Sequence, residues 1–201
     1  MNYQAPWWLP GGNLQTIWPA LFARRVRGAP IALRRERWRA PDGDVVAADW
    51  LAHDPAVPRA ASAQRTLLVL FHGLEGSSRS HYAQAFADVA RARGLGFVVP
   101  HFRGCGGVMN LAPRAYHSGD YEEIAWILAH LRTQHAGPLL AVGVSLGGNA
   151  LLRWAAEAGG GAARLATAVA AVSSPLDLAA GAPAIGRGFH RQGYTAMFLR
   201  S

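Results

Sequence analysis

The sequence predicts an α/β domain built on a mostly parallel β-sheet. Its 201 residues are 51% hydrophobic and 16% charged, which is the composition of a compact globular protein. From residue 66 onward, short continuous apolar runs alternate with segments of helical periodicity. Such runs are typical of parallel strands that are covered on both faces. Right-handed crossovers between them would place helices on both faces of the sheet.

Four apolar runs are predicted to be the strands of this sheet. They lie at 66–71, 96–102, 138–144 and 165–172, and the first three are expected to be buried in the sheet. Helices are predicted between them, at 80–93, after Asp120 and at 146–158. Asp120 and Glu123 have the spacing of an N-cap and its N3 partner, and apolar residues then follow at i, i+3, i+4 and i+7.

The segment before residue 66 has a different pattern. Residues 34–52, "RRERWRAPDGDVVAADWLA", indicate two antiparallel strands around an Asp-Gly turn. Residues 53–64 are rich in Pro, Ala and Ser and are expected to form a loop. Residues 1–30 are expected to be an N-terminal arm. Its tryptophans could contact a membrane, but we favour packing onto the domain. We therefore expect one domain over residues 1–201.

Composition limits the compartment and the kinds of site. The single cysteine, Cys105, cannot form an internal disulfide or a cysteine-rich metal site, which fits a reducing compartment. No run approaches the ~18 apolar residues of a membrane span, and the start lacks the pattern of a secretory signal. The histidines show no metal-binding spacing. A cytoplasmic protein without a bound metal is expected.

The net charge of +8 comes from arginine alone, because the sequence contains no lysine. Seven arginines crowd into one short segment: Arg24, Arg25, Arg27, Arg34, Arg35, Arg37 and Arg39. They could form a patch for the phosphates of nucleic acid or lipid. Alternatively, they are the solvated face of a half-buried strand. We favour the second interpretation and expect no nucleic-acid partner, because no nucleic-acid-binding motif accompanies the charge.

Ser145 lies where the third apolar run turns into a helix. Gly143 to Gly147 match G-x-S-x-G, the nucleophile elbow. The serine needs a strained backbone conformation to expose its hydroxyl, and side chains two residues away on either side would collide with the strand–helix packing. The amide of Leu146 would be free to bind an oxyanion at the helix N-terminus. A tight glycine turn without catalysis is the alternative.

A second motif, His72-Gly73-Leu74, directly follows the first apolar run. An oxyanion hole needs a second amide from this loop, and the Leu74 amide is the candidate. His72 could be a catalytic base, but we favour a role in bracing the loop, because the triad histidine comes last in this kind of fold. Cys105 lies in a glycine-rich loop after the second run, where a small packing residue is favoured over a reactive thiol.

Five segments in order resemble the α/β-hydrolase superfamily, and more narrowly the YheT-like esterase family. They are "RERWRAPDGDVVAADW", "FHGLEGSSRSHYAQAFADVARARG", "FRGCGG", "YHSGD" and "GVSLGGNALLRW". The opening "PWWLPGGNLQTIWPALFARR" is also similar, although Asn13 stands where many members have His. The resemblance implies a serine hydrolase of carboxylic esters, short-chain or acylglycerol-like, which needs no metal and no cofactor. It assigns the acyl-forming nucleophile to Ser145 and the oxyanion amides to Leu74 and Leu146.

The resemblance ends before the family's last two strands, acid and histidine. We therefore expect a C-terminally truncated chain that is inactive alone, with residues 173–201 as the start of a cap region. An internal triad of Ser145, Asp177 and His190 has the right order and is the alternative. The rival function is a non-catalytic module of the same fold that binds a partner through the arginines at 24–39. Oligomeric state and physiological substrate are left open.

Overall fold

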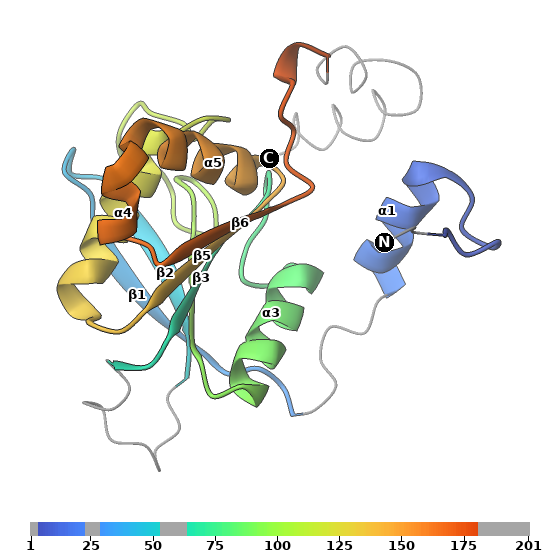
Figure 1. Cartoon of the computed structure of the whole chain (residues 1–201), viewed down its shortest axis with the longest axis horizontal. Coiled ribbons are helices and arrows are strands. Elements are labelled where there is room, and N and C mark those ends of the chain that lie inside the picture. The colour runs from blue at the N-terminus through green and yellow to red at the C-terminus, as the bar shows by residue number, and fades with distance from the viewer. Residues whose placement is uncertain (1–3, 23–28, 53–63, 181–201) are drawn as a thin grey trace.

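The chain folds around a six-stranded mixed sheet with the strand order β1-β2-β4-β3-β5-β6 (Figure 1). This computed structural model describes residues 4–22, 29–52 and 64–180. The strands are β1 (Leu33–Arg39), β2 (Val45–Leu51), β3 (Leu67–Phe71), β4 (Gly96–Pro100), β5 (Leu139–Val144) and β6 (Ala168–Val172). The helices are α1 (Gly11–Phe22), α3 (His81–Ala92), α4 (Tyr121–Gln134), α5 (Leu146–Ala158) and the 3-10 helix η1 (Gly159–Arg164).

The predicted parallel core and N-terminal hairpin are both confirmed. Strands β4, β3, β5 and β6 run parallel to one another, whereas β1 and β2 are antiparallel and β2 joins β4 antiparallel. In the hairpin, Leu33 pairs with Leu51 and Arg39 with Val45. The turn between them contains Gly43 at φ +88°, a left-handed conformation that favours glycine.

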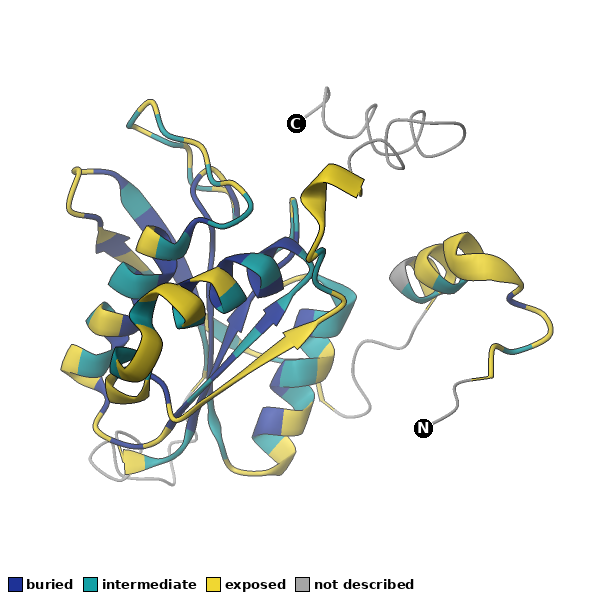
Figure 2. Cartoon of the chain, turned by 45° about the horizontal axis from the view of Figure 1, so that its top comes forward, coloured by how far each residue is buried: buried dark blue, intermediate teal, exposed yellow. Residues whose placement is uncertain are grey.

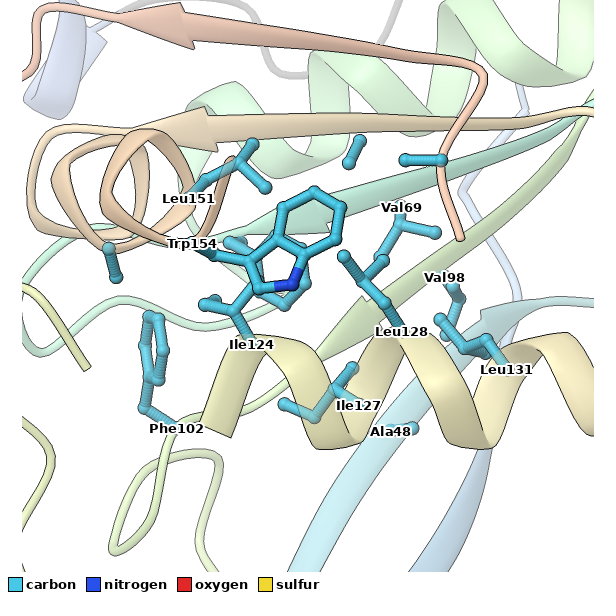
Figure 3. Packing of buried hydrophobic residues seen from close by; sticks show 14 of the residues in the cluster. Ala48, Val69, Val98, Phe102, Ile124, Ile127, Leu128, Leu131, Leu151 and Trp154 are labelled. Atoms are coloured by element: carbon cyan, nitrogen blue, oxygen red, sulfur yellow. The ribbon is translucent and has the colours of Figure 1, made fainter. Parts of the chain in front are cut away.

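Helices cover both faces of the central strands. Successive side chains of a strand point to opposite faces, so Val69 and Phe71 pack with residues of α4 and α5, whereas Leu68 and Leu70 pack with the alanines of α3. Figure 2 shows the buried strands between these layers. Figure 3 shows the larger cluster, in which Trp154 of α5 lies among aliphatic residues of α4 and the sheet.

A buried ion-pair network ties the loop after β4 to two other elements. Arg103 is 3% exposed and donates hydrogen bonds to Glu123 in α4 and to Asp42 and Asp44 in the hairpin turn. The capping residue Asp120 accepts a hydrogen bond from the Glu123 amide, as its spacing predicted. The burial of Arg103 was not predictable from local sequence, because its partners are 20 to 61 residues away.

The last strand is shorter than predicted. The predicted strand at 165–172 is shortened to Ala168–Val172, because residues 165–167 form a turn and a bend after η1. All five residues of β6 are exposed, so β6 is not a buried strand. It pairs with β5 along one edge, and no described strand pairs with its other edge. In the described part of the chain, all β6 residues thus stay exposed although α5 contacts the strand.

The N-terminal arm also differs from its expectation. Leu14, Ile17, Trp18 and Leu21 of α1 are all at least 40% exposed, and Figure 1 shows this helix standing apart from the sheet. The aromatic residues of the arm pack on one another instead, with the ring centroids of Trp8 and Trp18 5.2 Å apart. The apolar side chains of α1 therefore do not pack onto the domain, whereas the end of the arm contacts α3 through the bond from Arg91 to the Ala29 carbonyl.

We expect Trp154→Ala to lower the free energy of unfolding by about 3–5 kcal/mol, because it empties a large buried site. Trp154 is 2% exposed, whereas Val89 on α3 is 43% exposed. Val89→Ala is the matched control and is expected to change stability by less than about 1 kcal/mol. Urea unfolding of the two variants measures the difference. Equal losses would show that the α4–α5 side of the sheet is not the dominant core.

Candidate active site

Ser145 occupies the sharp turn between β5 and α5, as the sequence predicted. Its backbone has φ +53° and ψ −118°, a region that non-glycine residues rarely adopt and that stores strain. The amide of Ser145 donates to the carbonyl of Val172 at the end of β6, at 2.9 Å. The carbonyl of Ser145 accepts from the Asn149 amide at 3.0 Å, inside the first turn of α5. Both bonds hold the turn in its strained conformation.

The glycines on either side of Ser145 permit close backbone contact. A Cβ atom on Gly147 would lie 2.5 Å from the carbonyl oxygens of Phe71 and His72. A Cβ atom on Gly143 would lie 2.5 Å from the Gly147 carbonyl oxygen. Real Cβ atoms do not come this close to backbone, so only glycine fits either position without displacing a strand. The predicted steric reason for G-x-S-x-G is therefore confirmed.

The loop after β3 lies directly against the serine. A Cβ atom on Gly73 would be 3.2 Å from the Cβ of Ser145 and 3.4 Å from the Val144 carbonyl oxygen. Within the described ranges, neither the Leu74 nor the Leu146 amide donates a hydrogen bond to the protein. The two predicted donors thus belong to segments that meet at Ser145. Both remain candidates for binding an oxyanion.

His72 braces this loop. Its Nδ1 lies 2.7 Å from the Gly73 carbonyl oxygen and its Nε2 lies 3.0 Å from the amide of Phe102. The carbonyl requires a proton on Nδ1, and the amide requires a lone pair on Nε2. Complete burial lowers the pKa of His72 to about 3 and outweighs the bond to the Gly73 carbonyl, which acts in the opposite direction. The ring is neutral with both nitrogens bonded, which confirms the bracing role and leaves no nitrogen for proton transfer with Ser145.

A buried carboxylate holds the other end of the loop. Asp49 of β2 accepts hydrogen bonds from Ser78 Oγ at 2.5 Å, from His101 Nε2 at 2.9 Å and from the Arg35 guanidinium at 2.7 Å. Burial opposes ionisation of Asp49, but these donors outweigh it and hold its pKa far below the usual range. Sequence reasoning missed this residue. The feature that could have revealed it is an acidic residue inside the apolar strand "VVAADWL".

The alternative triad is not assembled in the described residues. Asp177 is exposed, and its Oδ1 accepts a hydrogen bond from the Ala180 amide at 2.8 Å. His190 lies outside the described residues. Between Ser145 and residue 180 the sequence contains no histidine. A base that follows Ser145 in the chain must therefore come from beyond residue 180.

Cys105 fills a gap in the loop after β4. It is 6% exposed and packs in the main hydrophobic cluster. Burial raises the pKa of its thiol to about 11, so the reactive thiolate is scarce at neutral pH. The interpretation of Cys105 as a packing residue is confirmed.

The structure describes only part of the arginine-rich segment 24–39. Arg24, Arg25 and Arg27 lie outside the described residues. Arg34 pairs with Glu36 at 2.6 Å, and Arg35 pairs with Asp49. These pairings fit the solvated strand face that we favoured. No helix in the described part of the chain is long and apolar enough to cross a membrane.

The fold and this site define the class of protein. Residues 66–198 match the family described as "alpha/beta hydrolase fold", and the chain belongs to this family. Among its relatives, "Putative esterase YheT" of Escherichia coli (strain K12) is 41% identical over 181 residues, covering 89% of this chain and 50% of that protein. "Phospholipase ABHD3" of Homo sapiens is 27% identical over 159 residues, covering 79% of this chain and 38% of that protein.

Solved structures share the fold at low sequence identity. The α/β-hydrolase GrgF from Penicillium sp. sh18 matches with a TM-score of 0.57 at 16% identity, covering 73% of this chain and 47% of that chain. The Pyrococcus furiosus esterase Pf2001 matches with a TM-score of 0.54 at 15% identity, covering 74% and 53%. The present chain spans half or less of the length of the relatives YheT and ABHD3.

The neutral state of His72 predicts a pH dependence of stability. Its folded pKa of about 3 lies below the unfolded value of 6.5, so the unfolded state binds more protons between these pH values. The contribution of neutral His72 to the free energy of unfolding is therefore complete above pH 6.5. Between pH 6.5 and about 3 it falls by about 1.4 kcal/mol for each unit by which the pH is lowered. Urea unfolding at pH 7, 6 and 5 should show this extra slope in the wild type relative to His72→Asn. Parallel stability curves for the two proteins would contradict it.

Proposed function

We propose that this chain carries the nucleophile of a serine hydrolase that cleaves carboxylic esters through an acyl-enzyme on Ser145. The observation that carries the proposal is the strained backbone of Ser145, at φ +53°, facing a loop with an unbonded amide. A turn with no catalytic role gains nothing from such strain. Membership of the α/β-hydrolase family supports hydrolysis as the reaction class.

In the proposed mechanism, Ser145 Oγ attacks the ester carbonyl carbon while a base takes the hydroxyl proton. The tetrahedral oxyanion then accepts hydrogen bonds from the amides of Leu74 and Leu146, and the N-terminal dipole of α5 stabilises the same charge. Collapse breaks the ester C–O bond, and the base returns the proton to the departing alcohol. Attack by water on the acyl-serine releases the acid and restores the Ser145 hydroxyl.

The acid and base are assigned by chain order. In this fold the sequence order is Ser, then Asp or Glu, then His. We propose that both partners follow the described residues, in a segment with no counterpart in this chain. His190, with Asp177 as its acid, is the alternative, because it is the only histidine that follows Ser145 in the sequence. His72 is not proposed, since both of its ring nitrogens are bonded.

We propose a short-chain or acylglycerol-like ester as the substrate. The names of two relatives, an esterase and a phospholipase, support ester cleavage in general. The non-catalytic module is not favoured. Two of its arginines, Arg34 and Arg35, already pair with carboxylates of the hairpin.

In a form of the protein that hydrolyses p-nitrophenyl butyrate, Ser145→Ala should lower kcat by on the order of 10⁶. The measurement is initial-rate kinetics together with labelling by a fluorophosphonate probe. Ser118→Ala is the control, because this serine lies outside the proposed machinery. Turnover that persists in Ser145→Ala would overturn the assignment.

The same probe separates the two assignments of the base. We expect no rapid labelling of the 201-residue chain, because an unassisted serine hydroxyl is a weak nucleophile. Rapid stoichiometric labelling that disappears in His190→Ala would establish the internal triad instead.

A further inference from the structure

The three consecutive amides after His72 are bonded unequally. The Gly73 amide donates to the hydroxyl of Tyr82 at 2.9 Å, and the Glu75 amide donates to the hydroxyl of Tyr116 at 2.9 Å. Between them, the Leu74 amide has no acceptor in the described ranges. The amides on both sides of the proposed oxyanion donor are thus hydrogen-bonded to tyrosine hydroxyls.

The peptide that contains the Leu74 amide is itself fixed by its carbonyl. The Gly73 carbonyl oxygen accepts from His72 Nδ1 at 2.7 Å and from the Gly76 amide at 2.9 Å. In a trans peptide, the carbonyl and the amide hydrogen point in opposite directions. Holding the Gly73 carbonyl therefore sets the direction of the Leu74 amide.

Tyr82 is held in the first turn of α3 and packs against the smaller hydrophobic cluster. The loop wraps closely around its hydroxyl, since a Cβ atom on Gly76 would lie 2.6 Å from that oxygen. The hydroxyl is thus enclosed between the Gly73 amide and the Gly76 backbone. This contact joins α3 to the loop at the residue before Leu74.

Tyr116 is held by stacking and makes two bonds to one residue. Its ring stacks on Phe102, with centroids 5.4 Å apart and planes 11° from parallel. Its hydroxyl accepts from the Glu75 amide and donates to Glu75 Oε1 at 2.5 Å. Glu75 has φ +50°, a conformation that a non-glycine residue keeps only when its surroundings hold it. Burial, and then the bond to Glu75, raise the pKa of Tyr116 well above its usual range, so the hydroxyl stays protonated.

We propose that Tyr82 and Tyr116 are positioning residues of the oxyanion hole. By accepting the amides of Gly73 and Glu75, they leave Leu74 as the one donor of this stretch that points to the reacting carbonyl. The inference rests on the proposed ester hydrolysis at Ser145. A donor that is aligned before the reaction needs no reorganisation when the oxyanion forms, which is why such alignment lowers the barrier.

Kinetics of the two hydroxyl deletions test this role. In a form of the protein that hydrolyses p-nitrophenyl butyrate, Tyr82→Phe and Tyr116→Phe should each lower kcat by roughly 10-fold or more, up to the ~10²–10³-fold that complete loss of an oxyanion donor costs. KM should change little, because the contact strengthens only in the transition state. Affinity for a trifluoromethyl ketone, which mimics the tetrahedral oxyanion, should fall in parallel. Tyr121→Phe is the matched control, because its ring contacts Arg153 and lies outside the loop.

Amide hydrogen exchange on the 201-residue chain tests the geometry without catalysis. Tyr82→Phe should accelerate exchange at Gly73, and Tyr116→Phe should accelerate it at Glu75, while the Leu74 amide exchanges fast in every variant. Unchanged exchange at Gly73 and Glu75 would overturn the tyrosine contacts. Accelerated exchange with unchanged kcat would overturn their role in the oxyanion hole. Activity that survives in Ser145→Ala would instead overturn the proposed function and leave the exchange pattern intact.

Discussion

The site depends on one close backbone approach, between the end of β3 and the start of α5. Gly147 lies so near the carbonyls of Phe71 and His72 that any side chain would separate them. Because β3 and β5 are parallel neighbours, this contact brings both of their following segments to one edge of the sheet. The strained serine is presented by one segment and the candidate oxyanion amide by the other. The pairing of β3 with β5 is thus what places the serine turn and the oxyanion loop next to each other.

Much of this fold was predictable because its signals are local. Apolar runs gave the parallel strands, Asp-Gly gave the hairpin, and Asp120 with Glu123 gave the start of α4. The exposure of β6 was not predictable, because "AVAAV" reads the same whether or not another layer covers it. Likewise, the tryptophans of the N-terminal arm predicted packing onto the domain, but Trp8 and Trp18 pack on each other.

The candidate site also contains residues that local sequence predicts and residues that it does not. The strain at Ser145 and the steric need for Gly147 follow from a short motif whose parts are sequence neighbours. Asp49 and Tyr116 could not be found like this, because their partners in the 72–80 loop are 29 and 41 residues away. Polar side chains that act over such distances are placed by the topology of the sheet. They become visible only when strands β2, β3 and β4 are assembled.

The bond from the Ser145 amide to the Val172 carbonyl has a wider consequence. Val172 ends the exposed strand β6, and edge strands with few buried contacts open at lower free energy than a core does. Each local opening of β6 would release one of the restraints on the strained turn, so the serine would relax toward an ordinary helix start. The conformation of Ser145 thereby depends on whether the edge strand β6 stays paired. Any strand, helix or partner that protects β6 would therefore also help to hold Ser145 in its strained conformation.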